Sequence, residues 1–343
     1  MKTLQASLLK WYKLNHRKLP WRLTRDPYKI WLSEIMCQQT QVATVISYYT
    51  RFLENYPDLL SLSRATEDDV YKLWEGLGYY SRAKRLMLCA RVVTQNYGGV
   101  FPKTYEEIMG LPGIGPYTAG AVASIAFDIK VPAVDGNVLR VYSRLYSVEE
   151  DIGKPGTKKT IEAMVSADLP EDVRNYNQAL MELGALICVP RNPKCDLCPI
   201  HNFCSARERN LQNILPIKTP KAKKQLKKMM VAYVVFEDQL LLEKRGTEGL
   251  LANLWGFPII EVGEDHPSSE MMAYLEDNYG LHVIEEDVIT TKKHVFTHLI
   301  WDMTLVRYRA RFISRIEDPE VAWIHPELIP NYPLPTAFLK LLK

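Results

Sequence analysis

The spacing of apolar residues along the chain changes near residue 229. Before that point, apolar side chains recur at helical spacing, as between Leu4 and Tyr12, and alternating patterns are few. After it, MMVAYVVF and QLLLEKR flank a short polar turn and predict a β-hairpin. SSEMMAYLEDNYG predicts a helix that ends at Gly280, and a short helix is predicted after PLPT. The pattern therefore predicts an all-α region followed by an α+β region.

The stretch LPGIGPYTAGAVASIAFDIKVPAVDGN, from Leu111 to Asn137, predicts two helices that are each entered through a special turn. Pro116 suits the first position of a helix, and the glycines before it allow a close approach of the backbone to a ligand. Exposed N–H groups at such a turn form an anion site, most simply for a phosphate. Asp135 begins the second helix, where it is either an ordinary N-cap or a functional carboxylate.

A second carboxylate lies in a helix that Asp26 and Pro27 start, as N-cap and first helical residue. Glu34 has apolar neighbours along this helix. Its side chain therefore either faces solvent or is partly buried with a raised pKa. The polar run from Gln38 to Gln41 then interrupts the pattern and indicates a helix junction exposed to a partner.

Composition narrows the functional classes. The 343 residues suggest two domains, and a net charge of +3 permits a nucleic-acid partner without requiring one. There is no apolar run of about 18 residues and no secretory signal pattern, so we expect a cytoplasmic protein that does not enter a membrane. Residues 216–228, which are rich in Lys, predict an interdomain linker.

Four cysteines follow the spacing C-x6-C-x2-C-x5-C and predict a metal centre; they are Cys188, Cys195, Cys198 and Cys204. Zinc held by four thiolates is the general alternative. The six-residue first gap is unusual for zinc ribbons, which favour paired CxxC units. It resembles the [4Fe–4S] loop of endonuclease III and its relatives, and we expect that cluster as the cofactor.

The motifs together cover nearly the whole chain: SEIMCQQTQV, GLGYYSRA, LPGIGPYTAG, VDGNV, the four-cysteine loop, and FTH within the α+β region. The chain resembles the MutY-type adenine DNA glycosylases of the helix-hairpin-helix superfamily. The resemblance implies a helical glycosylase region at 1–215, with a six-helix barrel at about 27–135 and an iron–sulfur part at 1–26 and 136–215. A nudix (MutT-like) α+β domain is then expected at 229–343, after the linker.

The resemblance also implies a reaction, the removal of adenine mispaired with 8-oxoguanine or guanine in double-stranded DNA, by a monomer that flips the adenine out. Glu34 is then expected to protonate adenine and later to activate water, with a pKa raised by apolar surroundings. Asp135 is expected to stabilise the oxocarbenium-like sugar, with a pKa lowered by the helix N-terminus. By the same resemblance, Asn137 hydrogen-bonds Asp135 or the sugar region, and Tyr117 assists protonation above the pocket.

Residues that contact DNA are expected in three places. The resemblance assigns the wedge positions to Gln39 and Tyr79, with Thr40 beside the lesion. The hairpin and the basic clusters add Gly113, Gly115, Arg22 and Arg82, although aromatic and basic residues in such turns are also common in simple packing. The family reads 8-oxoguanine through a Phe-Ser-His turn, and here the corresponding residues are Phe296, Thr297 and His298, where Thr retains the hydroxyl.

Three other functions compete with this interpretation. A bifunctional glycosylase/lyase of the endonuclease III type needs a lysine where this chain has Tyr117, and a non-catalytic lesion sensor would not need both Glu34 and Asp135. A nudix pyrophosphatase needs several acids on its metal-binding helix. Aligned on Gly280, those positions are Tyr274, Asp277 and Asn278, so one acid remains. We therefore expect the second domain to recognise the lesion without catalysis of its own.

Overall fold

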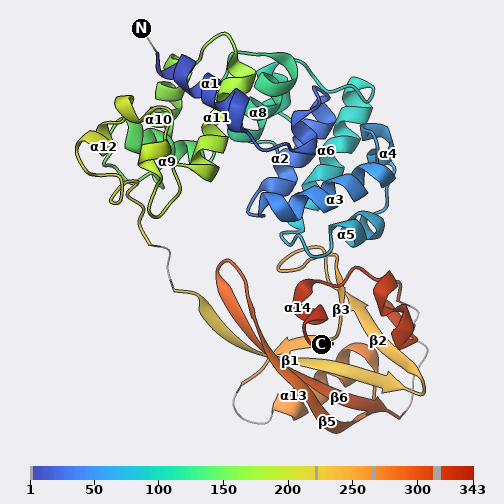
Figure 1. Cartoon of the computed structure of the whole chain (residues 1–343). Coiled ribbons are helices and arrows are strands. Elements are labelled where there is room, and N and C mark those ends of the chain that lie inside the picture. Colours follow the sequence, from blue (N-terminus) through green and yellow to red (C-terminus); the bar gives the residue numbers. More distant parts are fainter. Residues whose placement is uncertain (1–2, 221–222, 264–266, 312–317) are drawn as a thin grey trace. The chain divides into compact units, whose positions relative to one another are not determined.

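The computed structural model describes residues 3–220, 223–263, 267–311 and 318–343. The chain folds into two compact units (Figure 1). Unit 1 comprises Met1–Ala65 and Lys84–Pro220, and unit 2 comprises Thr66–Ala83 and Lys221–Lys343. No helix in the described part of the chain combines the length and apolarity that crossing a membrane requires.

The described residues of unit 1 form helices and connecting loops without strands. The helices are α1 (Leu4–Asn15), η1 (Pro20–Arg22), α2 (Pro27–Cys37), α3 (Val42–Asn55), α4 (Leu59–Ser63), α7 (Tyr105–Met109), α8 (Pro116–Phe127), α9 (Gly136–Leu145), α10 (Pro155–Asp168), α11 (Val173–Leu186), η2 (Cys195–Leu197), η3 (His201–Phe203) and α12 (Ser205–Glu208), together with most of α6 (Ser81–Tyr97).

The predicted helix starts are confirmed. Asp26 caps α2 by accepting a hydrogen bond from the amide of Tyr28, and Pro27 is the first helical residue. Pro116 likewise begins α8 after Gly115. The polar run after Cys37 separates α2 from α3, as predicted, with Gln39 in the left-handed region at φ 57°.

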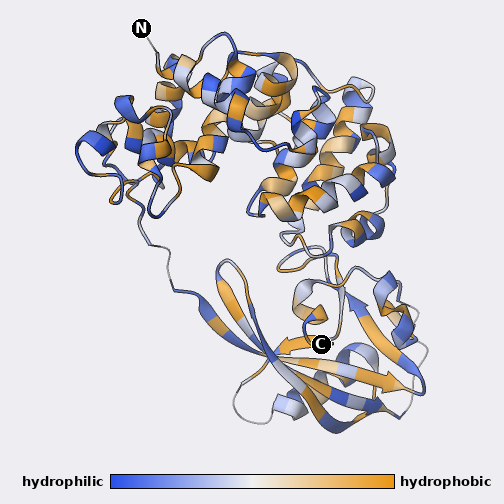
Figure 2. Cartoon of the chain, in the orientation of Figure 1, coloured by the Kyte–Doolittle hydropathy of each residue, from blue (hydrophilic) through white to orange (hydrophobic). Residues whose placement is uncertain are grey.

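Helix α8 is buried from Thr118 to Ala126, and this burial brings the next loop close to it. A Cβ atom on Gly120 would lie 2.1 Å from the carbonyl oxygen of Pro132, so only glycine allows this packing. The loop therefore runs tightly along α8 before Asp135 caps α9. Figure 2 shows hydrophobic and hydrophilic residues interspersed along the helices, and most of the buried residues are hydrophobic.

Unit 2 is built on a mixed seven-stranded sheet within the described residues, with the order β3-β2-β1-β6-β5 and with β4 paired to β1 and β7 to β2. Strands β1 and β6 are parallel, and the other pairs are antiparallel. Alternate residues of β1 face two cores, which α13 and α14 cover. The elements are α5 (Glu67–Trp74), β1 (Gln225–Phe236), β2 (Gln239–Lys244), β3 (Trp255–Gly256), β4 (Ile259–Glu261), α13 (Pro267–Tyr279), β5 (Val283–Val295), β6 (Leu299–Ala310), β7 (Val321–Ile324), η4 (Pro326–Asn331) and α14 (Thr336–Leu339).

The predicted hairpin, the helix before Gly280 and the short helix after PLPT are confirmed, whereas the predicted boundaries differ from the structure. Strand β1 already begins at Gln225, inside the predicted linker 216–228. Its first residues are mostly exposed, and Lys227 pairs with Glu261 at 2.5 Å, so lysines are compatible with this solvated end of the strand. The segment 66–83, predicted to lie in the glycosylase region, belongs to unit 2.

Candidate active site

Glu34 lies on α2 beside the first turn of α8. The hydroxyl of Tyr117 donates a hydrogen bond to its Oε2 atom. Burial raises the pKa of Glu34 to about 7, and the negative charge of Asp135 adds to this increase, while the Tyr117 hydrogen bond and the charge of Arg22 oppose it. The residue as a whole is half-buried. The raised pKa predicted for Glu34 is therefore confirmed.

Asp135 caps α9 with both carboxylate oxygens. Its Oδ1 atom accepts hydrogen bonds from the amides of Asn137 and Val138 at 2.9 and 2.8 Å, and Oδ2 accepts one from Asn137 Nδ2 at 2.7 Å. The prediction that its pKa is lowered is wrong. Burial raises the pKa, because desolvation outweighs the three N–H donors and the charge of Arg140.

Asn137 is fixed from its other side. Arg140 donates to Asn137 Oδ1 at 2.9 Å, to the carbonyl oxygen of Gly184 at 2.8 Å and to that of Cys188 at 2.8 Å. A Cβ atom on Gly184 would lie 2.6 Å from the Cβ atom of Asn137. The position of Asn137, and through it that of Asp135, therefore depends on the close packing of α9 against α11.

The sequence did not reveal an ion cluster around Glu182, whose member Arg22 acts electrostatically on Glu34. Glu182, on α11, binds Arg17 and Arg22, each at 2.7 Å. Although burial raises its pKa, the hydrogen bonds from these arginines lower the value to about 2. Arg22, predicted to contact DNA, therefore directs its guanidinium to Glu182 and places positive charge near Glu34. Glu182 and Arg22 are 160 residues apart, so no local sequence pattern could have predicted that they pair.

The predicted DNA-contacting turns have unusual backbone conformations. Gln39 and Tyr79 have φ values of 57° and 50°, which non-glycine residues rarely adopt. Gln39 is exposed, Thr40 is partly exposed, and Tyr79 is 45% exposed. Gly113 has a φ of 76°, and both it and Gly115 are exposed at the turn before α8. Such conformations persist only where surrounding structure enforces them, and they concentrate at functional sites.

Arg82, also predicted to contact DNA, is only 7% exposed. It donates hydrogen bonds to the carbonyl oxygens of Leu77 and Gly78 at 3.2 and 3.0 Å, and its guanidinium lies 5.7 Å from the ring centroid of Tyr79. The structure therefore shows this arginine shaping the turn that carries Tyr79.

The predicted lesion-reading residues form the turn between β5 and β6. Thr297 and His298 are exposed, whereas the ring of Phe296 packs against the ring of Trp301, with 4.8 Å between centroids. Lys224 donates to the carbonyl oxygen of Phe296 at 2.7 Å. The side chains of Thr297 and His298 are therefore exposed at this turn, while Phe296 is held by its packing against Trp301.

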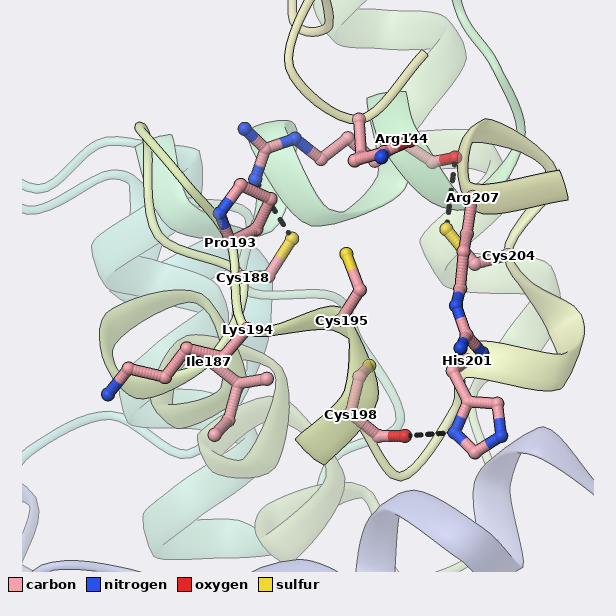
Figure 3. A pocket seen from close by; sticks show the side chains of 11 residues that line it. Arg144, Ile187, Cys188, Pro193, Lys194, Cys195, Cys198, His201, Cys204 and Arg207 are labelled. Carbon is pink, nitrogen blue, oxygen red and sulfur yellow. Dashed lines mark hydrogen bonds between the residues drawn. The ribbon is translucent and has the colours of Figure 1, made fainter. Parts of the chain in front are cut away.

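The four cysteines predicted to bind a cluster line one pocket (Figure 3). None of the four forms a disulfide. The sulfur atoms instead surround a space, as a multi-iron cluster requires, and Arg144 donates to Cys188 Sγ at 3.3 Å. These residues therefore fit a [4Fe–4S] cluster.

Family models match three parts of the chain. Residues 32–167 match the HhH-GPD superfamily base excision DNA repair protein, and residues 230–343 match the NUDIX domain. Residues 188–204, which include all four of these cysteines, match the iron–sulfur binding domain of endonuclease III.

Curated relatives extend over most of the chain. The adenine DNA glycosylase of Buchnera aphidicola subsp. Baizongia pistaciae is 35% identical over 85% of this chain and 82% of its own length. The adenine DNA glycosylase of Rattus norvegicus is 33% identical over 99% of this chain and 77% of its own length. Among solved structures, a thermostable thymine-DNA glycosylase is 32% identical, with a TM-score of 0.54, over 60% of this chain and 94% of that one.

Proposed function

This chain belongs to the family of adenine DNA glycosylases, and we propose that its substrate is adenine paired with 8-oxoguanine or guanine in double-stranded DNA. The chain is a DNA glycosylase of the HhH-GPD superfamily. The observation that carries the proposal is the proximity of Glu34 and Asp135, which lie close enough for the charge of Asp135 to raise the pKa of Glu34 and which have contrasting hydrogen-bond environments. We expect the enzyme to act as a monomer at the nucleoid in the cytoplasm.

Glu34 is the proposed general acid. Adenine leaves poorly until a ring nitrogen is protonated, so the acid must carry a proton near neutral pH. A pKa of about 7 leaves roughly half of the Glu34 side chains protonated at pH 7, whereas an ordinary glutamate would be almost fully ionised. Because Tyr117 donates to Oε2, the other oxygen of Glu34 is the one that would meet the base at N7.

Asp135 is the proposed anion beneath the sugar. All three of its hydrogen bonds come from N–H groups, which stabilise the charged form of a carboxyl. A carboxylate held in this way stabilises the positive charge that develops on the sugar as adenine leaves. Once ionised by proton transfer, Glu34 serves as the base that activates the attacking water.

Strand cleavage is not expected. A lyase of the endonuclease III type requires an amine that forms a Schiff base with the sugar, and a phenol at Tyr117 forms none. Tyr117 is moreover engaged with Glu34. The product is therefore an intact strand with an abasic site.

Recognition of the pair requires that adenine leaves the stack. The left-handed backbone at Gln39 and Tyr79 supports their proposed roles as wedges that fill the space left behind, with Thr40 nearby. The exposed glycine turn at Gly113 and Gly115 is the proposed phosphate site. On the opposite strand, Thr297 and His298 are the proposed hydrogen-bonding groups for 8-oxoguanine.

The [4Fe–4S] cluster would be held by Cys188, Cys195, Cys198 and Cys204. When bound, it supplies structural cross-linking rather than an open coordination site, because all four protein ligands are used. Arg140 links this loop to the reaction centre, since it binds both the carbonyl oxygen of Cys188 and the side chain of Asn137.

Single-turnover release of adenine from four duplexes tests the proposal. Three of the duplexes place adenine opposite 8-oxoguanine, guanine or thymine. The fourth, a further control, places cytosine opposite 8-oxoguanine. We expect rapid release opposite 8-oxoguanine, slower release opposite guanine and none from the other two. Strands should break only after alkali, and borohydride should trap no adduct. Tight binding without release would instead identify a lesion sensor, and a borohydride-trapped adduct would identify a lyase.

A further inference from the structure

Unit 2 contains a segment that the sequence places elsewhere. Residues 66–83 lie inside the stretch that matches the HhH-GPD family, 32–167, yet they cluster with the nudix-like domain. The segment comprises α5 and the glycine turn that presents Tyr79. The contacts that hold it there identify one residue as central.

Asp68, in the first turn of α5, uses both carboxylate oxygens on the sheet. Its Oδ1 atom binds Lys244 Nζ at 2.8 Å, and Oδ2 accepts a hydrogen bond from Trp255 Nε1 at 3.2 Å. Lys244 and Trp255 are partners across β2 and β3, and the Lys244 ammonium lies 5.8 Å from the centroid of the Trp255 ring. One carboxylate therefore bridges a cross-strand pair.

Two further contacts flank this bridge. Asn253 Nδ2 donates to Glu67 Oε2 at 3.1 Å, and Lys72 Nζ donates to the carbonyl oxygen of Tyr332 at 3.3 Å. The Tyr332 ring packs edge-on against Trp255, with 5.0 Å between centroids. The helix is thus held to one surface from its first turn to its last.

A rigid turn connects this helix to Tyr79. Trp74 Nε1 donates to the carbonyl oxygen of Gly78 at 3.1 Å, and Arg82 binds the carbonyl oxygens of Leu77 and Gly78. Thr297 Oγ1 in turn donates to Tyr79 Oη at 3.2 Å. The wedge tyrosine and the lesion-reading turn therefore touch within one compact unit.

We infer that Asp68 is a positioning residue that, through Lys244 and Trp255, holds Tyr79 against the turn at Thr297, so that the two read the base opposite adenine together. The inference rests on the proposed function. It separates two properties of the enzyme: the contacts of Asp68 set the preference for 8-oxoguanine, whereas the chemistry at Glu34 is unaffected by them.

The test compares Asp68→Ala with Asp69→Ala, which removes the same charge from the same helical turn. Asp69 is exposed, and its side chain accepts a hydrogen bond from Thr66 within the helix cap. We expect Asp68→Ala to lower the ratio of single-turnover rates for 8-oxoguanine:A over G:A by about tenfold or more, with the G:A rate within about twofold of wild type. Asp69→Ala should leave the ratio unchanged.

A double-mutant cycle with Lys244→Ala sharpens the result. Because both residues belong to one contact, the double variant should lose no more preference than either single variant. Hydrogen exchange of the full-length protein should show faster exchange at residues 67–74 in Asp68→Ala, with α13 unchanged. An equal loss on both substrates, an additive cycle, or unchanged exchange would overturn the inference. A wild-type enzyme without adenine release or 8-oxoguanine preference would instead refute the proposed function.

Discussion

The helical unit and the sheet unit each place a glutamate beneath a tyrosine hydroxyl. Tyr117 donates to Glu34, and Tyr279 donates to Glu243. Burial raises the pKa of both glutamates. Only Glu34 has a second carboxylate, Asp135, close enough to influence its pKa. A raised pKa therefore does not identify a reaction centre unless a second group with a different role lies beside it.

The surroundings of Glu243 explain its lack of a partner acid. Tyr274, one of the positions where a nudix hydrolase would carry a metal ligand, donates to Glu243 at 3.4 Å. Two phenols from α13 thus cover the carboxyl of Glu243.

The largest effect is expected from removing the charge of Asp135. Asp135→Asn keeps the size of the side chain and an oxygen for the cap, but it removes the anion beneath the sugar. Single-turnover release of adenine should fall by about 10³-fold or more. A decrease of less than tenfold would show that Asp135 acts only as an N-cap. Glu34 would then no longer differ from Glu243 in having a second functional carboxylate beside it.

Glu34→Gln should lower the rate of adenine release by about 10² to 10⁴-fold, because the amide cannot donate the proton that adenine needs.

The same substitution should stabilise unit 1 at pH 8. The folded-state pKa of about 7 exceeds the ordinary value of 4.5, so the stabilising contribution of protonated Glu34 is complete below about pH 4.5 and is lost as the pH rises through 7.

Glutamine does not titrate, so its gain at pH 8 should be about 1–3 kcal/mol after allowance for partial solvent access. Thermal unfolding at pH 5 and pH 8, followed by circular dichroism at the helix band, measures it. A variant that loses stability equally at both values would contradict the raised pKa of Glu34.

Gly184→Ala tests whether close packing around Asn137 matters to the site. The new Cβ atom would lie 2.6 Å from that of Asn137, so Asn137 and the Asp135 cap must shift. We expect about a tenfold slower adenine release and about 1–3 kcal/mol lower stability of unit 1. Gly156→Ala on α10 is the control, since no atom lies within 4 Å of its added Cβ and its activity should match wild type.

The smallest effect is expected at the other buried glutamate. Glu243→Gln should leave adenine release opposite guanine within about twofold of wild type, because Glu243 has no part in the reaction. Parallel assays of the wild type and the variant on the G:A duplex check this. A large loss of this rate would show that the two glutamates are not as different as their surroundings indicate.

Local signals in the sequence predict much of the fold. Asp26 and Pro27, Pro116, and Gly280 mark helix ends through capping and backbone preferences that act over a few residues. The sign of the pKa shift at Asp135 could not be predicted in this way. Its helix N-terminus is a local feature, but its burial depends on the packing of a loop against α8 at Gly120.

Contacts between residues that are distant in the sequence could not be predicted from local patterns either. Glu182 joins Arg17 and Arg22 only because α11 folds back near η1. The assignment of residues 66–83 to unit 2 depends on contacts such as Asp68 with Lys244, which are 176 residues apart. The role of Arg82 followed the same rule, since a basic residue after a glycine turn gives no sign of whether it binds phosphate or the turn itself.

The pH dependence of single-turnover adenine release tests most directly whether Glu34 is the acid. In the wild type the rate should fall as the pH rises through about 7. In Tyr117→Phe the loss of the hydrogen bond that lowers the pKa of Glu34 should move this decline to higher pH. A wild-type rate that stays constant from pH 6 to about pH 8.5, or a decline that moves to lower pH in the variant, would contradict the account.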